Sequence, residues 1–305
     1  MKSYSNEHII LLLILILSGF GVVVMYSASS IYAMNKYNNY MFFLSHQIKW
    51  VLMGFIFMIG VSKVNYHILK KITYGLLILS WIVLILGYFF KGPNPAARWL
   101  IIGGRSWMTT SDFARISLII FTAFFIEKNN KYLNNWKFIT IYYAPFLFVT
   151  LLLILFQPDT STTITITIII LVMLFVASVS WKFILSMIIV GITSLTIKII
   201  YTPYAFNRII NWNDEQKVQA LNALGTGGLL GSGLGDSIVK NGYLPEAHTD
   251  FILPIIGEEL GFLGIIILFI LFLLLYRVSI SVVQKAPDRF SMFLSIGIIT
   301  STMVY

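Results

Sequence analysis

Residues 251–275 are FILPIIGEELGFLGIIILFILFLLL. This run is long enough to cross a bilayer, because a helix that spans the hydrocarbon core needs roughly 20 predominantly apolar residues. It carries Glu258 and Glu259 near its start, and Asp250 stands immediately before it. An acid inside a span is costly, so we expect Glu258 to face a bundle interior or a water-filled cavity. The stretch therefore predicts a membrane helix with a polar site at its beginning.

Similar apolar runs recur along the 305 residues, of which 58% are hydrophobic and 11% charged. This composition excludes soluble domains and predicts an all-α fold, a polytopic membrane helix bundle that forms a single transmembrane domain over residues 1–305. The ninth predicted span reaches the last residue, so we expect a C-terminal part to be missing. The nine predicted spans are residues 8–26, 46–62, 72–90, 111–126, 139–156, 162–180, 183–201, 251–275 and 290–305.

Two of these runs have alternative interpretations. The first could be a signal peptide, but its apolar run exceeds the usual length of about 7–15 residues. Residues 160–174, TSTTITITIIILVML, alternate with the period of a β-strand. A lone strand in lipid would leave its backbone groups without partners, so we predict a helix there.

The distribution of basic residues predicts the orientation, because Lys and Arg concentrate in cytoplasmic loops. With the N-terminus inside, residues 202–250 form a large extracytoplasmic loop between spans seven and eight, and the net charge of +9 is mostly a cytoplasmic-face signal. We therefore expect no nucleic-acid partner. The inner segments hold eleven of the 21 basic residues: Lys2, Lys63, Lys70, Lys71, Lys128, Lys131, Lys137, Lys182, Arg277, Lys285 and Arg289.

Asp250 has two interpretations that the residues alone leave open. Aspartate is among the best N-caps, and Pro254 is tolerated in a first helical turn. A carboxylate at the outer mouth of a span is equally suited to act as a base. Asp250 and Glu258 share one helix face, about two turns apart.

A second polar set precedes the fourth span. Thr110 or Ser111 is predicted to cap that helix, and Asp112 and Arg115 are spaced to form a pair on one helix face. The pair could simply neutralise itself at the membrane edge, or Arg115 could bind a phosphate.

Arg98 and Trp99 in the loop before this helix would suit a pyrophosphate and a sugar face. Aromatic and basic residues at a membrane surface are also ordinary interfacial anchors. Both interpretations stay open at this point.

The glycine-rich run LGTGGLLGSGLG, residues 224–235, does not match a phosphate-binding loop, and no strand precedes it. We predict tight turns and close helix packing instead. Asp159 is predicted to cap the helix that follows it. The chain has no cysteine and no metal-ligand spacing, so we assign no metal site.

Several motifs resemble the SEDS family (shape, elongation, division and sporulation) of bacterial cell-wall polymerases, FtsW, RodA and SpoVE. YLPEAHTDFI is the most specific, and its Ala247 is closer to the FtsW and SpoVE branch. Where the family usually has QPSEFAK, this chain has TTSDFAR at 109–115, so a role of Arg115 beyond charge is in question. The matching stretches are VMYSASS (24–30), ARWL (97–100), QPDTST (157–162), LVMLFVAS (171–178), QKVQALNALGTGG (216–228), GLGDSIVK (233–240) and YLPEAHTDFI (243–252).

The resemblance implies ten transmembrane helices in the bacterial cytoplasmic membrane. It also implies polymerisation of lipid II into β-1,4 glycan strands, with release of undecaprenyl diphosphate, in cell division or sporulation. Asp250 would be the catalytic carboxylate, because an inverting transfer needs a base that takes the proton of the incoming hydroxyl. The remaining residues that the resemblance places at the substrate are Arg98, Trp99, Asp112, Arg115, Lys240, Glu246, His248, Thr249 and Glu258.

The implied partners are lipid II, membrane lipids, a class b penicillin-binding protein (a transpeptidase) and division or elongation proteins. No cofactor is assigned, and assistance by a divalent cation is left open. A flippase for the lipid-linked precursor, with Asp250, Glu258 and Arg115 as coupling charges, is the main alternative function. A non-enzymatic scaffold is a third.

Overall fold

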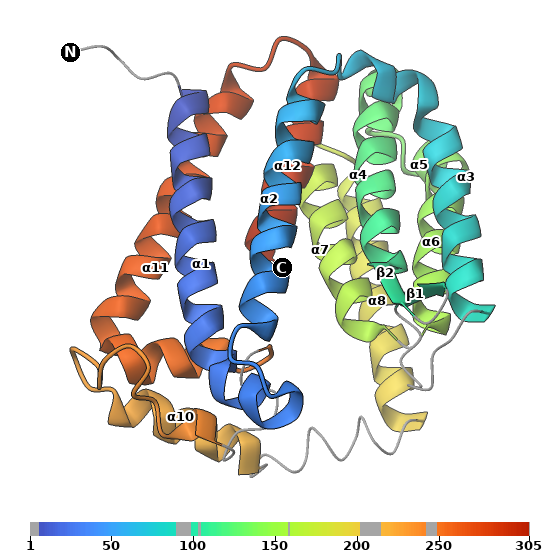
Figure 1. Cartoon of the computed structure of the whole chain (residues 1–305). Coiled ribbons are helices and arrows are strands. Elements are labelled where there is room, and N and C mark those ends of the chain that lie inside the picture. The colour runs from blue at the N-terminus through green and yellow to red at the C-terminus, as the bar shows by residue number, and fades with distance from the viewer. Residues whose placement is uncertain are drawn as a thin grey trace. The chain divides into compact units, whose positions relative to one another are not determined.

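The computed structural model describes residues 6–89, 99–102, 105–157, 159–201, 215–241 and 249–304. Figure 1 shows that these residues are almost entirely helical. The helices are α1 (Asn6–Tyr37), α2 (Phe42–Ser62), α3 (His67–Phe89), α4 (Thr110–Lys128), α5 (Trp136–Tyr142), α6 (Ala144–Phe156), α7 (Thr160–Val176), α8 (Trp181–Tyr201), α10 (Glu215–Thr226), α11 (Ile252–Gln284) and α12 (Arg289–Val304), with the short 3-10 turns η1 (Asn130–Tyr132) and η2 (Val239–Asn241).

Each predicted span coincides with one of these helices or, for residues 139–156, with the bent pair α5 and α6. The all-α membrane bundle is confirmed, and the stretch with alternating threonine and isoleucine is the helix α7. By length and composition, α1, α2, α3, α8 and α11 can each cross a membrane, and the pair α5–α6, bent by 50°, can form a further span. The helices α7 and α12 are apolar but shorter.

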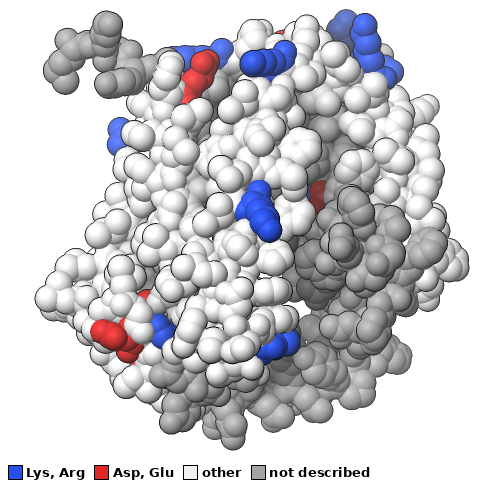
Figure 2. Space-filling model, viewed as in Figure 1, with Lys and Arg blue, Asp and Glu red and all other residues white. Residues whose placement is uncertain are grey.

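The surface agrees with a lipid environment. On the face drawn in Figure 2, most of the described atoms belong to uncharged residues. In α2 none of the residues is buried, and the side chains of Ile56 and Phe57 are largely exposed. Such apolar exposure is what a helix needs when its surroundings are lipid.

The chain divides into two compact units, each built from segments distant in sequence. Unit 1 contains residues 1–64 and 198–279 and therefore holds α1, α2, α10, η2 and most of α11. A small buried cluster in this unit joins Ala28 of α1, Ala223 of α10, Val239 of η2 and Ile255 of α11. Because two of these four side chains are alanines, the backbones can approach closely.

The helix α11 is interrupted at Gly261, whose backbone angles are φ 68° and ψ −170°. The glycine-rich loop after α10 lies against this break. The N–H groups of Ser232 and Gly233 donate to the carbonyls of Glu258 and Glu259, at 2.9 and 3.0 Å. Backbone groups inside a membrane must find such partners, because no water is there to satisfy them.

The same loop also serves the second half of α11, since the N–H groups of Phe262 and Leu263 donate to the carbonyls of Gly228 and Leu229. The loop must come very close to do so. A Cβ added to Gly231 (φ 81°) would lie 2.2 Å from the carbonyl oxygen of Glu259. The prediction that the glycine-rich run provides tight turns and close packing is confirmed.

Unit 2 contains residues 65–197 and 280–305. Its centre is α4, which packs against α3, α7 and α12. Ala114, Leu118, Phe121 and Ile126 of α4 are fully buried in the main apolar core. Glycine again permits a close approach, because a Cβ at Gly297 of α12 would lie 2.5 Å from a methyl carbon of Ile119.

A β-hairpin leads into α4 and was not predicted from the sequence. Its strands β1 (Trp99–Ile102) and β2 (Arg105–Thr109) are antiparallel, with an irregularity between Leu100 and Ile101. The second strand ends at Thr109, directly before the first residue of α4.

Candidate functional site

Asp250 lies in a turn just before α11, and its side chain is exposed. Within the described residues, no hydrogen bond or ion pair holds its carboxylate. The interpretation of Asp250 as an N-cap predicts an N–H donor from the first turn of α11, and the described residues provide none. The side chain is thus accessible to a ligand, with Thr249 exposed beside it.

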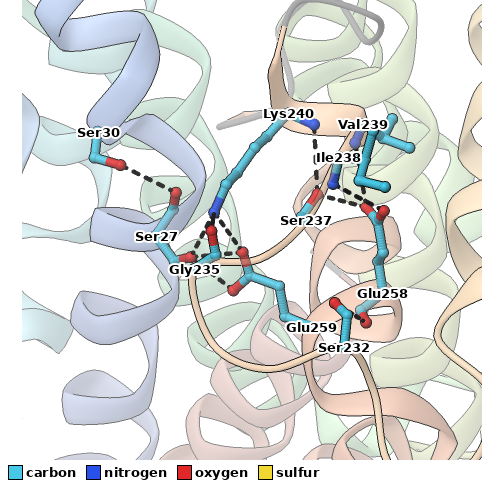
Figure 3. Close-up of polar contacts among 10 residues, drawn as sticks. All are labelled: Ser27, Ser30, Ser232, Gly235, Ser237, Ile238, Val239, Lys240, Glu258 and Glu259. Carbon is cyan, nitrogen blue, oxygen red and sulfur yellow. Dashed lines mark hydrogen bonds and ion pairs between the residues drawn. The ribbon is translucent and has the colours of Figure 1, made fainter.

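Glu258 lies within α11 and has a different environment from Asp250, which precedes the helix. It is almost completely buried and accepts hydrogen bonds from the hydroxyl of Ser237 and from the N–H groups of Ile238 and Val239 (Figure 3). Its carboxylate therefore fixes the backbone that enters η2. The expectation that Glu258 faces the interior of the protein is confirmed.

Lys240 and Glu259 form a buried ion pair next to it. The lysine Nζ lies 2.7 Å from Oε1 of Glu259, and each side chain is only 2% exposed. The hydroxyl of Ser27 on α1 donates to the same carboxylate, and Nζ also donates to the carbonyl of Gly235 (Figure 3). Buried charges persist only when they are paired and hydrogen-bonded, and this pair is both.

Sequence reasoning did not assign a role to Ser27 or Glu259. Ser27 belongs to VMYSASS, one of the family-like stretches, and Glu259 directly follows Glu258. These two facts were the available signals. No local sequence pattern shows that the fold brings α1, η2 and α11 together.

The pair of Asp112 and Arg115 forms as predicted in the first turn of α4. One guanidinium nitrogen of Arg115 lies 3.0 Å from Oδ1 of Asp112. The hydroxyl of Thr109 donates to the other carboxylate oxygen. Arg115 is mostly buried, whereas about a third of the Asp112 side chain is exposed.

The predicted cap of α4 is wrong. The N-cap residue is Thr109, and its side chain makes no capping hydrogen bond. Thr110 and Ser111 lie inside the helix, where their hydroxyls contact Gln157 and Asp159 instead. A buried hydroxyl with a side-chain partner is not available for a cap.

The stretch QPDTST fastens α4 to its neighbours in unit 2. Asp159 caps α7 as predicted, because its Oδ1 accepts the N–H of Thr162. Its other oxygen accepts the hydroxyl of Ser111, 3.1 Å away. Gln157 accepts from Thr110 and donates to the carbonyl of Leu84 in α3. The start of α4, which carries Arg115, is therefore held by buried polar contacts.

The predicted site residues are distributed unevenly. Asp250, Thr249, Lys240 and Glu258 belong to unit 1, whereas Asp112 and Arg115 belong to unit 2. Arg98, Glu246 and His248 lie outside the described residues, and Trp99 is described only as backbone of β1. Among the described residues, no group of three or more His, Cys, Asp or Glu could hold a metal ion.

Comparison with known proteins gives consistent matches over nearly the whole chain. The family model for FtsW, RodA and SpoVE, described as "Cell cycle protein", matches residues 7–305. A probable peptidoglycan glycosyltransferase FtsW from Geobacter sp. strain M18 is 37% identical, over 96% of this chain and 83% of its own length. Stage V sporulation protein E from Bacillus subtilis is 30% identical, over 98% of this chain and 85% of its own.

Two solved structures have the same fold. The rod-shape-determining protein RodA from Thermus thermophilus has a TM-score of 0.69 and 19% identity, over 96% of this chain and 80% of its own. A chain of a peptidoglycan synthase complex that coordinates polymerisation and crosslinking has a TM-score of 0.76 and 19% identity, over 99% of this chain and 84% of its own. At this identity the likeness shows the fold alone.

Proposed function

The chain belongs to the FtsW/RodA/SpoVE family, and from that premise we propose that it is a peptidoglycan glycosyltransferase. Its substrate would be lipid II, which it would polymerise into β-1,4 glycan strands with release of undecaprenyl diphosphate, in cell division or sporulation. The observation that carries the proposal is the family match over residues 7–305 together with an exposed carboxylate, Asp250, in the most specific family-like motif.

Asp250 is the proposed general base. Lipid II is an α-linked sugar pyrophosphate, so a β-linked product requires inversion at the anomeric carbon. Asp250 would take the proton of the incoming sugar hydroxyl while that oxygen forms the new bond and the pyrophosphate leaves with the old bonding pair. Its exposure and its lack of an ion pair in the described residues leave it accessible for that role.

The leaving pyrophosphate requires positive charge. We propose Arg115 and Arg98 as its ligands, with Trp99 at a sugar face. Asp112 would orient Arg115 through the ion pair of α4. Glu246, His248 and Thr249 remain proposed substrate contacts because they flank the base in the same motif.

The protein is a multi-pass membrane protein, and we propose the orientation with the N-terminus inside and Asp250 on the extracytoplasmic side. The Lys and Arg distribution supports this orientation. In this cysteine-free chain, a cysteine at Asn241 should react with an impermeant thiol reagent in intact cells, and one at Asn130 should not. Labelling of the Asn130 site alone would reverse the proposed orientation.

The proposed partner is a class b penicillin-binding protein, a transpeptidase that crosslinks the strands. A structural relative occurs in a peptidoglycan synthase complex, which supports this partner class. Co-purification of the full chain with such a transpeptidase from the same membranes is expected, and its absence under mild extraction would contradict the assignment.

The direct test uses the purified full chain with lipid II in lipid vesicles. Asp250→Asn preserves the side-chain volume and removes the base, so polymerisation should fall by about 10²–10⁴-fold. The matched control is Asp236→Asn, which neutralises another exposed aspartate of unit 1 and should leave the rate unchanged. Equal rates for wild type and Asp250→Asn would exclude Asp250 as the base. Lipid II transport without polymerisation by the wild type would indicate the flippase instead.

A further inference from the structure

The buried network in unit 1 suggests how the proposed base is held in place. We propose that Ser27, Lys240 and Glu259 are positioning residues, which hold the turn carrying Asp250 without contacting substrate. The proposal rests on the function proposed above. It concerns three segments that are distant in sequence: α1, η2 and the first half of α11.

The ammonium group of Lys240 is fully engaged by contacts within the protein and is not free to bind a ligand. Its Nζ donates to Glu259 at 2.7 Å, to the carbonyl of Gly235 at 2.6 Å and to the hydroxyl of Ser27 at 3.3 Å. An ammonium group has three donors, so every donor already has an acceptor. With 2% of its side chain exposed, Lys240 cannot reach a phosphate in solvent or lipid without breaking the pair.

The two adjacent glutamates hold different parts of one loop. Glu258 accepts the backbone N–H groups of Ile238 and Val239, whereas Glu259 pairs with the side chain of Lys240. Figure 3 shows both carboxylates directed from α11 towards the loop that enters η2. Backbone and side-chain contacts together fix the position of η2 on α11.

Asp250 stands in the turn just before this helix. Phe251 and Ile252, which directly follow Asp250, pack against the small cluster that contains Val239 of η2 and Ala28 of α1. The turn at Asp250 therefore lies next to η2, whose backbone is bound by Glu258 and whose Lys240 pairs with Glu259. We infer that the buried pair holds η2 in place and, through this packing, sets the direction of the Asp250 carboxylate.

Because α11 is broken at Gly261, we expect the network to affect mainly the first half of this helix. The carbonyls of Glu258 and Glu259 bind the glycine-rich loop through Ser232 and Gly233 rather than the next helical turn. The first half of α11 thus belongs to a body formed with residues 227–241 and with Ser27 of α1. Disturbing the pair should move the turn at Asp250 more than it moves the second half of α11.

The test uses the double variant Lys240→Met/Glu259→Gln, which removes both buried charges and leaves neither one unpaired. In the lipid II assay we expect kcat to fall at least ~10-fold while KM stays within ~3-fold, since misplacing a catalytic group weakens the chemical step. The matched control is Lys70→Met/Glu127→Gln in unit 2, whose ion pair has the same length of 2.7 Å. It should leave both constants within ~2-fold.

A second measurement does not depend on activity. Spin labels on cysteines at Asp250 and at Tyr276, in the second half of α11, report the distance between the turn and that half of the helix. The distance distribution should broaden in Lys240→Met/Glu259→Gln and keep its width in the control double variant. If the double variant does not fold, Ser27→Ala removes one hydrogen bond to Glu259 and should produce the same change with smaller amplitude.

The outcomes separate the two proposals. A lower kcat with an unchanged distance distribution would overturn the positioning role, because the residues would then act on substrate directly. A broadened distribution with unchanged kcat would overturn it as well. If the wild type does not polymerise lipid II at all, the proposed function fails, and the distance distributions alone decide whether the network holds the turn.

Discussion

Each unit of the molecule contains a lysine that joins segments distant in sequence. In unit 1, Lys240 pairs with Glu259 at 2.7 Å, and both side chains are 2% exposed. In unit 2, Lys70 of α3 pairs with Glu127 of α4 at the same distance, but 21% and 27% of these side chains are exposed. The two pairs have the same nitrogen–oxygen distance but differ in burial and in the further partners of each lysine.

The partly exposed network around Lys70 contains more charged side chains than the buried one. Lys70 also contacts Asp288, 3.2 Å away, at the start of α12, and it lies 5.1 Å from the centre of the Phe290 ring. His67 adds a contact to Asp288 at 3.3 Å. Water reaches these groups and screens their attraction, so each contact contributes little by itself.

The same lysine–glutamate distance therefore does not show how strongly the fold depends on the pair. A buried pair is no large source of stability, because desolvation offsets its Coulomb attraction, but each partner strongly requires the other. Lys240 and Glu259 therefore fix a conformation, whereas Lys70 and its partners reinforce contacts that the apolar core of unit 2 already makes. Three predictions test this distinction.

The largest expected effect is on stability after loss of one lysine. Lys240→Met leaves the carboxylate of Glu259 buried without its partner and should cost about 3–5 kcal/mol of unfolding free energy. Lys70→Met removes the same charge at a partly exposed position and should cost about 1 kcal/mol or less. Denaturant unfolding of both full-chain variants in one detergent measures the difference. Losses of equal size would refute the distinction drawn from burial.

Much of the fold could be predicted from local sequence. Long apolar runs marked the helices, the spacing of Asp112 and Arg115 marked an ion pair, and Asp159 marked a helix start. Each of these signals lies within one continuous stretch of sequence, where periodicity and capping rules apply. They required no knowledge of the tertiary structure.

The buried network could not be predicted in this way. Ser27 and Glu259 are 232 positions apart, so no local pattern connects them. The break of α11 was hidden as well, because Gly261 stands in an otherwise continuous apolar run and only the approach of the glycine-rich loop explains it. The hairpin before α4 is short and has no alternating pattern long enough to detect.

A smaller effect is expected where the backbone supports the buried network. Gly231→Ala forces an alanine into a left-handed conformation and places its Cβ 2.2 Å from the carbonyl of Glu259, so it should destabilise the protein by about 2–3 kcal/mol. Gly225→Ala is the control, because it lies in α10 with open space around it and should be neutral or stabilising by up to ~1 kcal/mol. Equal stability of both variants would mean that the loop can move away from α11 freely.

The smallest effect concerns the acid dependence of the partly exposed network around Lys70. Burial alone would raise the pKa of the Asp288 carboxyl, but hydrogen bonds from the Ser291 hydroxyl and N–H and from Lys70 lower it to about 2. A carboxyl whose pKa is lowered by folding stabilises the protein above its unfolded pKa, near 3.8. This contribution is lost as the pH falls from about 4 towards 2.

Asp288→Asn should therefore remove part of the stability loss between pH 4 and pH 2, by about 1 kcal/mol or less, because water screens the group. Thermal unfolding of the full chain at intervals across this range measures the slope. Asp236→Asn, the same exchange at an exposed aspartate that forms no ion pair within the described residues, is measured alongside as the control. An acid slope of Asp288→Asn equal to that of the wild type would show that Asp288 does not carry this acid dependence.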